Sequence, residues 1–559
     1  MLAVLLTALM FSQGLSMDSR GTSFITAFPE NVAFYFQKTY NLLKITTLHP
    51  NTAVSVIEMA SGNITNSAAG NNGTILTLNF SKDAEEYQFA FSNKSIRITS
   101  DKNITVLSMS GWEGRFQSRV VQPDQNLRTV YQIPALNYTK IAASFNLSVA
   151  SNVTFLNFRL MIINAVDGDN SVTIKYGDGS GQSQDTIALG PFELFQMQIN
   201  GSEGEITATD EVAVILTHPC LDTVNCSCNM VVNQLKPQVS DRKVARFPVP
   251  SIFGVKQLFV TTNQAFKVCQ GVFNDANSIQ VQKSVDILPL FPNFLSSALL
   301  ISTNIGVSLR LISPGLILDL MPTSMFSGCF LVDFNSSRSG ALVIANTSST
   351  TGVKMNDQPL NVIWYPLNGT EYSWALVEAQ VIGTIWHPNT KIGVYMTQRL
   401  DSNIIYGSQA VALNMDLDQN GCLLTPEIFV LGQDSMNWSM SLQYCSDKYD
   451  QLATLNAKSA QDKMVLNMSL IQPTLGWIGL RRSLFTTEWY WSNNVNVNFT
   501  FWELGQPDKP EKGLCASVAL DPSKKFTWQS ARCCSENKPV CYSGQKYFIY
   551  SRTTKQMLS

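Results

Sequence analysis

Four oxygen-bearing residues between positions 416 and 427 have the types and spacing that could hold a calcium ion. Asp416, Asp418, Asn420 and Glu427 follow the ligand order of an EF-hand loop, with a glycine at the bend. Pro426 directly precedes the glutamate, which does not favour the helix that should follow such a loop. The alternative is therefore a polar turn in a linker spanning residues 413–427.

Neither the histidines of this sequence nor a search for nucleophile motifs supports an enzyme. The chain has 3 histidines, and His49, His218 and His387 each precede a proline, which favours extended or turn backbone. We find no G-x-S-x-G, no H-E-x-x-H and no phosphate-binding glycine loop. A carboxylate pair for glycoside cleavage stays open, because the separation that matters is spatial. The sequence predicts a protein that is not an enzyme.

The residues from Cys445 to Cys541 combine spaced cysteines with many aromatic side chains. Between these two cysteines stand Trp477-Ile478-Gly479-Leu480, Glu488-Trp489-Tyr490-Trp491-Ser492, Gln506-Pro507-Asp508, Cys515, Trp528 and Cys533. Such a segment suits an oxidised domain with long loops, which gains stability from disulfides because its loops bury little apolar surface.

At these residues the sequence resembles the C-type lectin-like fold, over residues of about 428–542. The family's core motif reads here as the Trp-Ile-Gly-Leu segment at 477–480. The resemblance implies an α+β domain with an outer bridge from Cys445 to Cys541 and a loop bridge from Cys515 to Cys533. It covers about a fifth of the chain.

The resemblance also implies candidate ligand-binding residues. In sugar-binding members of the family, a Gln-Pro-Asp triplet binds Ca²⁺ and sugar hydroxyls, so Gln506 and Asp508 are the ligand candidates and Asp508 the metal ligand. Glu511 is the nearest substitute for an acidic ligand that is displaced here, and Trp502 is an apolar support. These candidates lie in a loop region around residues 503–530.

The second ligand pair of the family departs from its pattern. Where sugar-binding members carry Asn-Asp after the tryptophan, this chain has Gln529-Ser530. Two interpretations stay open. In the first, the domain binds sugar with the help of Ca²⁺; in the second, it is a lectin-like scaffold that binds either protein or, without metal, glycan.

The remaining cysteines leave several pairings open. The chain has 11 cysteines, and removing the two implied pairs leaves an odd number, so one is free or pairs between chains. We expect Cys422 and Cys534 to form a third bridge of the lectin-like domain. A zinc site of His218 with nearby cysteines is possible in principle, but an oxidising compartment favours disulfides. The partners of five cysteines are not assigned from sequence: Cys220, Cys226, Cys228, Cys269 and Cys329.

The N-terminus and the glycosylation signals predict a secreted glycoprotein. Residues 1–16 read as a signal peptide, and no later apolar run is long enough to span a membrane. There are 16 Asn-x-Ser/Thr sequons, and charged residues make up only 14% of the chain, with a net charge of -2. Nucleic acid is therefore a poor partner. The glycosylation candidates singled out are Asn63, Asn103, Asn146, Asn346 and Asn437.

The middle of the chain predicts a mainly β fold of tandem β-sandwich units. A pattern of two strands across a tight polar turn is expected at 95–107, 204–216 and 383–395, each with further strands upstream. We expect unit 1 at 17–130, unit 2 at 131–245, and unit 3 at 246–412 with an insertion near 284–370. The lectin-like domain follows at 428–542 and a tail at 543–559.

Residues 21–410 carry a second resemblance. Segments 21–31, 211–220 and 391–395, with Cys226 and Cys228, look like the N-terminal domain family named after the IgG-Fc-binding mucus protein. In that family the region is extracellular and accompanies mucus-type or adhesive modules. No residue here matches an Fc contact, so antibody binding is not expected.

These observations favour extracellular recognition or adhesion, with glycans or glycoproteins as partners of the lectin-like domain and Ca²⁺ as the candidate cofactor. The alternative is a structural mucus or matrix component that assembles through its β units or an unpaired cysteine.

Overall fold

The computed structural model divides the chain into two compact units, residues 1–422 with 548–559 and residues 423–547. The division at residues 422 and 423 lies inside the linker expected from sequence. The structure describes residues 18–31, 39–112, 115–145, 147, 157–177, 183–199, 201–222, 228–237, 245–250, 257–261, 266–270, 278–281, 285–289, 297–302, 308–333, 339–378, 383–400, 403–468 and 474–548. The expected signal peptide lies outside these residues. No helix in the described ranges is long and apolar enough to cross a membrane.

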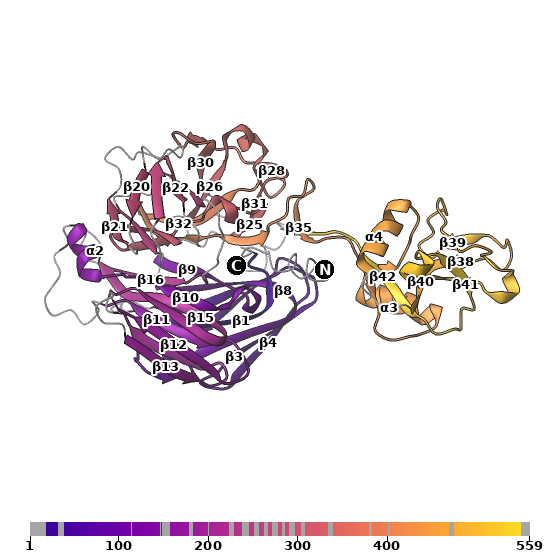
Figure 1. The fold of residues 1–559 in the computed structure, drawn as a ribbon, viewed down its shortest axis with the longest axis horizontal. Helices are drawn as coiled ribbons and strands as arrows, with labels where there is room; N and C mark the ends of the chain where they lie inside the picture. Colours follow the sequence, from indigo (N-terminus) through magenta and orange to yellow (C-terminus); the bar gives the residue numbers. More distant parts are fainter. Residues whose placement is uncertain are drawn as a thin grey trace. The chain divides into compact units, whose positions relative to one another are not determined.

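The first unit is built from β-strands, as predicted (Figure 1). Its first set of strands spans 21–121 and centres on one long strand, β8, to which the others add. The set comprises β1 (Gly21–Pro29), β2 (Tyr40–Thr47), β3 (Thr52–Glu58), β4 (Asn63–Ala69), β5 (Ile75–Phe80), β8 (Ser95–Trp112) and β9 (Arg115–Val121). The first half of β8 pairs with β1 and β3, and the second half pairs with β2 and β9. A strand that changes partners along its length builds both layers of a sandwich around one core.

The same pairing order occurs in a second set, at 128–234, around the long strand β15. This set comprises β10 (Arg128–Ile133), β11 (Arg159–Asn164), β12 (Asn170–Tyr176), β13 (Ser183–Leu189), β14 (Leu194–Gln198), β15 (Gly204–Asp222) and β16 (Cys228–Gln234), with the helix α2 (Tyr138–Ser144) after β10. Strands β10 and β12 add to the first half of β15, and β11 and β16 add to its second half.

Residues 246–412, expected as one unit with an insertion, contain two further sets with this order. In each, two shorter strands replace the long one and lie in separate sheets. The third set comprises β17 (Ala245–Val249), β18 (Gln257–Thr261), β19 (Phe266–Gln270), β20 (Ser278–Val281), β21 (Val285–Pro289), β22 (Ser297–Ser302), β23 (Ser308–Ser313) and β24 (Leu316–Asp319). The fourth comprises β25 (Cys329–Val332), β26 (Ser339–Asn346), β27 (Lys354–Met355), β28 (Gln358–Pro359), β30 (Tyr372–Val377), β31 (Gly383–Trp386), β32 (Gly393–Leu400) and β33 (Asn403–Gln409). Whether each set is a domain of its own stays a prediction.

The hairpins expected from sequence are wrong in a consistent way. Residues 95–107 lie within the single strand β8, and residues 204–216 lie within β15. The polar residues taken as a turn stand where the long strand bends: the partners of β1 step from Ile104 to Thr99 between Gly21 and Ser23. At 383–395, β31 and β32 belong to different sheets. An alternating pattern broken by polar residues fits a bent strand as well as a hairpin.

The last strands of the four sets meet one another. Strand β9 lies against both β16 and β33, and β24 lies against the same two strands, so the four form a closed ring. Side chains bridge each junction. The Gln122 amide N–H donates to Gln234 Oε1 at 3.1 Å. Asn233 Nδ2 donates to the Ile317 carbonyl at 3.2 Å, and Gln409 Nε2 donates to the Asp319 carbonyl at 3.3 Å. The hydroxyls of Ser118 and Ser408 lie 3.3 Å apart.

The second unit combines two helices with one central sheet. Its sheet has the order β36-β42-β38-β40-β41, with β37 beside β42 and β39 beside β38. The elements are β36 (Ile428–Leu431), α3 (Trp438–Lys448), β37 (Gln451–Leu452), α4 (Lys458–Met468), β38 (Thr474–Arg482), β39 (Trp489–Trp491), β40 (Cys515–Leu520), β41 (Trp528–Ala531) and β42 (Lys538–Ser543). Strands β35 (Cys422–Thr425) and β43 (Lys546–Phe548) pair where the chain enters and leaves it.

Candidate functional site

Four buried tryptophans form the scaffold of the second unit, and the indole N–H of each of these four has an acceptor. Trp477 donates to the Met436 carbonyl at 2.8 Å, and Trp438 donates to the Ile478 carbonyl at 2.9 Å. Trp491 donates to Asn456 Oδ1 at 3.1 Å, and Trp528 donates to Gln461 Oε1 at 3.0 Å. Because these bulky side chains are both packed and hydrogen-bonded, they fix the sheet that carries the loops.

Gly479 occupies a position that has no room for a side chain. A Cβ there would lie 2.9 Å from the Ser492 hydroxyl and 3.2 Å from the Ala453 carbonyl oxygen. The Gly479 amide donates to the Ala453 carbonyl at 2.8 Å, and its own carbonyl accepts from the Ser492 amide at 2.7 Å. The glycine of the core motif therefore brings three segments together.

Two disulfides hold the ends and the loops of the second unit. Cys445 bonds Cys541, and Cys515 bonds Cys533, which are the pairs that the resemblance implies. The first joins α3 to β42, and the second fixes the chain on either side of β41. Both therefore restrain the segment from 503 to 530.

The expected third bridge, Cys422 with Cys534, is wrong. Cys422 bonds Cys329, and Cys534 is free and exposed among the described residues. Strand β25 pairs with β34 (Val411–Asn414), which sets Cys329 opposite Asn414 and brings the following residues beside it. In the second set, Cys220 bonds Cys228. Cys226 lies outside the described residues, and the side chain of Cys269 is not described.

Gln506 and Asp508 lie together, and Ser530 on β41 organises them. The Gln506 side-chain oxygen accepts hydrogen bonds from the Ser530 amide at 3.0 Å and from the Ser530 hydroxyl at 2.8 Å. The Asp508 amide donates to the Ser530 hydroxyl at 2.9 Å. Ser530 takes the place of a ligand residue of sugar-binding members, so sequence comparison marks it only as a departure. Its role emerges from these contacts.

Two cationic side chains hold Asp508 from the other side. Lys512 Nζ lies 3.5 Å from Asp508 Oδ1, and Arg482 Nη1 donates to the Asp508 carbonyl at 3.1 Å. The same guanidinium donates through Nε to the Thr487 carbonyl at 2.7 Å. Arg482 therefore ties the turn after β38 to the candidate loop, a role that its sequence context does not indicate.

The residues around Asp508 do not suit a bound calcium ion. Ca²⁺ takes about six to eight oxygen ligands, usually with more than one carboxylate. Glu511 is exposed, and Glu503 accepts a hydrogen bond from Gln529 at 2.5 Å. No group of three or more Asp, Glu, His or Cys side chains that could hold a metal occurs in the described part of the chain. The cation next to Asp508 Oδ1 in this structure is the exposed ammonium of Lys512, at 3.5 Å.

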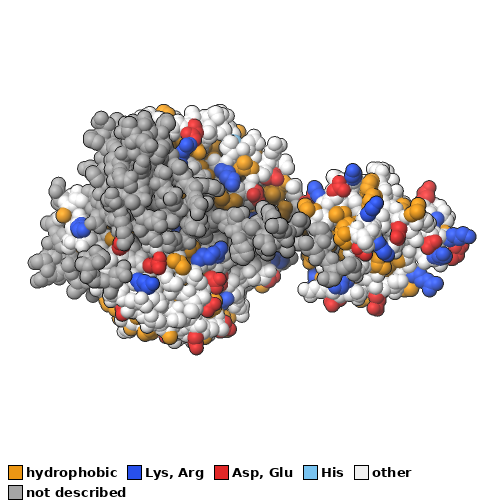
Figure 2. Space-filling model, viewed as in Figure 1, with side chains coloured by type: hydrophobic (Ala, Val, Ile, Leu, Met, Phe, Trp, Pro, Cys, Tyr) orange, Lys and Arg blue, Asp and Glu red, His pale blue; other side chains and the backbone are white. Residues whose placement is uncertain are grey.

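The other sequence candidates have structural roles or separate positions. Trp502 packs against Trp489, with ring centroids 4.8 Å apart, and against Trp528 at 5.7 Å. Two exposed apolar side chains, which sequence reasoning did not single out, stand outside the regular elements, one after β38 and one two residues before Gln506: Phe485 is 98% exposed and Leu504 fully so. On the face shown in Figure 2, basic, acidic and hydrophobic side chains of the second unit are interspersed.

The EF-hand-like spacing does not lie between helices. Strand β34 precedes it, β35 lies within it and β36 follows Glu427, so the expected calcium loop lacks the helix pair. The Asn420 amide donates to Asp418 Oδ1 at 2.8 Å, as in an Asx turn, and the Asp416 amide donates to Asn414. Glu427 belongs to the second unit, where it forms an ion pair with Lys463 on α4.

The histidines of the first unit have structural surroundings. His218 is buried and stacks on Tyr138, with ring centroids 5.3 Å apart. His387 Nδ1 accepts from the Asn389 amide at 3.0 Å and the Thr390 amide at 2.9 Å. Burial lowers the pKa of His387. A neutral ring suits these contacts, because a protonated Nδ1 would face two N–H donors.

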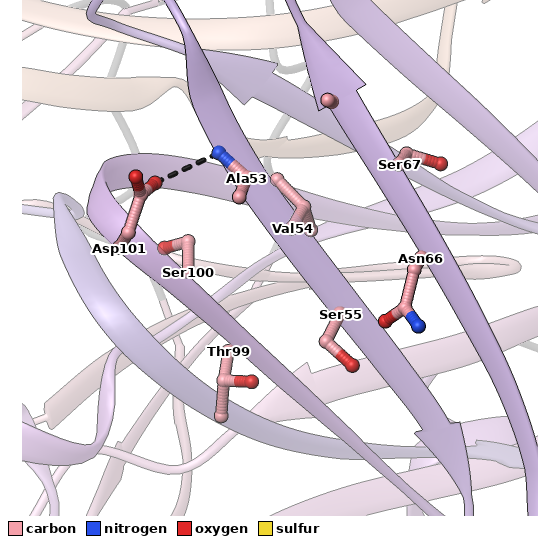
Figure 3. Close-up of a pocket in the computed structure, with 9 residues that line it drawn as sticks. Ala53, Val54, Ser55, Asn66, Ser67, Thr99, Ser100 and Asp101 are labelled. Atoms are coloured by element: carbon pink, nitrogen blue, oxygen red, sulfur yellow. Dashed lines mark hydrogen bonds between the residues drawn. The ribbon is translucent and has the colours of Figure 1, made fainter.

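A hollow of about 470 Å³ lies over β3, β4 and β8 of the first set (Figure 3). Small and polar side chains line it, among them Ser55, Asn66 and Thr99. Asp101 accepts a hydrogen bond from the Ala53 amide at 2.8 Å. No aromatic side chain or second acid lines this hollow, so it offers little to hold a ligand firmly.

The glycosylation candidates differ in exposure. Asn63 is exposed on β4, and Asn103 is half-buried on β8. The side chains of Asn346 and Asn437 cap a 3-10 helix and α3 by accepting backbone N–H bonds. Asn146 lies outside the described residues.

Comparison with known proteins supports the resemblance of the second unit. Residues 434–543 match the family described as the lectin C-type domain. The C-type lectin-like fold expected at the C-terminus is confirmed by this match. The matched residues are about a fifth of the chain.

Related proteins match over the same part. C-type lectin lectoxin-Phi1 of Philodryas olfersii is 28% identical over 119 residues, which are 20% of this chain and 74% of that protein. C-type lectin domain family 4 member E of Homo sapiens is 22% identical over 143 residues, covering 24% of this chain and 62% of that protein. The solved structure of human lithostathine is 20% identical and covers 22% of this chain and 93% of its own, with a TM-score of 0.20.

Proposed function

We propose that the protein is a secreted glycoprotein of extracellular recognition or adhesion, and that its C-type lectin-like unit binds glycan or glycoprotein without transforming it. The match to the lectin C-type domain supports this, as do the four disulfides of the described residues, which suit an oxidising compartment. The likeness of residues 21–410 to the domain family of the IgG-Fc-binding mucus protein, and the signal peptide, stay predictions.

The contacts of Ser530 carry the more specific part of the proposal, which is that recognition does not need Ca²⁺. Gln506 and Asp508 are held by Ser530, Lys512 and Arg482 through hydrogen bonds and one ion pair. Because protein groups already order this site, a ligand that binds in the absence of metal does not have to order it. The exposed Phe485 and Leu504 of the same unit offer apolar contact area to a ligand.

A glycan array probed with the full chain, in calcium and in chelator, tests the proposal. We expect the same binding pattern in both buffers. A flat array in both would remove sugar recognition, and binding that chelation abolishes would contradict a calcium-independent site.

The variant Ser530→Ala tests the site itself. It removes one donor to Gln506 and one of the two acceptors of the Asp508 amide, the other being Gln506 Oε1. At about 1 kcal/mol for each net hydrogen bond, affinity should fall by roughly tenfold. Ser535→Ala, at an exposed serine of the same unit, is the control and should bind as the parent does. Equal affinities of the two variants would place recognition elsewhere.

The alternative function is a structural mucus or matrix component. The exposed free thiol of Cys534 is the observation in its favour. Non-reducing electrophoresis of the secreted protein separates the two: ladders that collapse on reduction and are absent in Cys534→Ser support assembly, and a clean monomer supports soluble recognition.

A further inference from the structure

A partly open hollow, here called the hub hollow, lies where β9, β16, β24 and β33 meet. It has a volume of about 60 Å³, and residues from all four sets line it. A buried water needs about 10–15 Å³ on this measure, so the hub hollow has room for a small ion with a few waters. Its lining includes Gln122, Gln234, Lys236, Asp319 and Gln409.

Two glutamines that line the hub hollow have side-chain N–H donors that are not used in the described part of the chain. The Gln234 side-chain oxygen accepts from the Gln122 backbone amide, and the Gln122 side-chain oxygen accepts from Asn126 Nδ2 at 3.0 Å. Their oxygens are therefore already used. Among the described residues neither side-chain nitrogen has a hydrogen-bond partner, so both N–H₂ groups stay available to an acceptor.

The cations at the hub hollow outnumber the carboxylates. Lys236 Nζ donates to Met325 Sδ at 3.5 Å, and a thioether is a weak acceptor for an ammonium with three donors. The carboxylate of Asp319 lies 2.8 Å from Arg310 Nε, which already compensates its charge. Arg119, the other charged lining residue, donates to the neutral oxygens of Thr26 and Ala27. Strand β33 contributes only uncharged lining residues.

Burial lowers the pKa of Lys236 to about 8. The ammonium is therefore the predominant form near neutral pH. The carboxylate of Asp319 attracts it, but Arg310 shares that carboxylate. Lys236 is half-buried, and a cation removed from water is costly unless a counter-charge compensates it. Amide donors without acceptors and an excess of cations over carboxylates both favour an anionic ligand.

We propose that the hub hollow is a site for a small monovalent anion, such as chloride, held by the Lys236 ammonium and the glutamine amides. Because residues of all four sets line the site, the anion links them at the point where the ring closes. The proposal concerns the first unit alone and is independent of glycan recognition by the second.

Thermal unfolding of the full chain in sodium chloride against sodium gluconate, at constant ionic strength, tests the proposal. We expect a saturating rise of about 2 °C in the melting temperature with chloride. The rise should vanish in Lys236→Met and persist in Lys391→Met, which removes an exposed lysine. No chloride effect in the parent chain, or an equal effect in Lys236→Met, would overturn the proposal.

A second measurement covers the case in which Lys236→Met does not fold. Crystals of the parent protein grown in bromide should show an anomalous peak within about 3.5 Å of Lys236 Nζ. A map without a peak in the hub hollow would refute the site, whatever peaks occur on the surface.

Discussion

Replacing Gln461 with leucine should destabilise the second unit more than any exposed substitution on its helices. Gln461 is 3% exposed on α4. Its Nε2 donates to the Phe526 carbonyl at 2.9 Å, and its Oε1 accepts from the indole of Trp528 at 3.0 Å. Leucine occupies a similar volume, but it leaves a buried N–H and a buried carbonyl without partners.

The magnitude follows from these two groups. Each unpaired buried group costs about 1–3 kcal/mol, and the gain from burying an apolar side chain offsets about 1–2 kcal/mol of the sum. We therefore expect Gln461→Leu to lower the free energy of unfolding by about 2–4 kcal/mol. The Trp528 backbone also pairs with Phe501 and Glu503, so glycan affinity should fall with stability.

Urea unfolding of the full chain at 25 °C, followed by tryptophan fluorescence, measures the change, because Trp477, Trp491 and Trp528 are fully buried in the second unit. Gln443→Leu is the control, since Gln443 is exposed on α3; we expect a change within about 0.5 kcal/mol. If the two variants unfold at the same urea concentration, the reasoning about unpaired buried groups is wrong.

Three further predictions concern other parts of the chain. Burial lowers the pKa of His387. The stability that its neutral ring contributes is therefore present above about pH 6.5 and is lost as pH falls through the pKa of the folded state. Measuring unfolding of the first unit at pH 5 and 7.5 should show this loss in the parent and not in His387→Asn. Cys329→Ser opens a bridge of separation 93 and Cys220→Ser one of separation 8, so urea denaturation should show losses of about 4.6 and about 2.5 kcal/mol, and the reverse order would contradict the chain-entropy argument. Arg482→Met keeps the apolar stem but removes two bonds to loop carbonyls; hydrogen exchange over residues 503–514 should quicken about tenfold, and unchanged exchange would remove its role.

The sequence predicts the second unit better than the first, because its pattern combines residue types that constrain one another. Tryptophans, a glycine with no room for Cβ and cysteines at fixed spacing define one fold. The network of the candidate loop was not predictable in the same way. Ser530 lies 22 residues from Asp508, and Arg482 lies 26 residues from it; no local pattern reports such contacts.

The first unit shows how a local pattern can support two structures. Residues such as Asp101 and Lys102 interrupt an alternating segment, and both a turn and a bend in a long strand tolerate them. The order of the strands in the sheet distinguishes the turn from the bend, and that order depends on pairing between strands across the whole set. The sequence also predicts one unit at 246–412 where the structure has a third and a fourth set. This happens because β20 of the third set and β31 of the fourth each resemble a strand of the other sets. Cys422 is likewise expected to join the entry of the lectin-like domain to its end at Cys534, whereas it bonds Cys329, whose strand pairs with β34.

The ring of last strands makes the two ends of the first unit neighbours. Lys44 forms an ion pair with Asp333 at 2.6 Å, and the Phe116 amide donates to Gln398 across a separation of 282 residues. A ribosome extends the chain by about 5–20 residues each second, so strand β9 waits for tens of seconds before β33 exists to cover it. During that interval its uncovered side is a surface on which a neighbouring nascent chain could substitute its own fourth set, and folding of this protein should depend on chaperones that shield this strand.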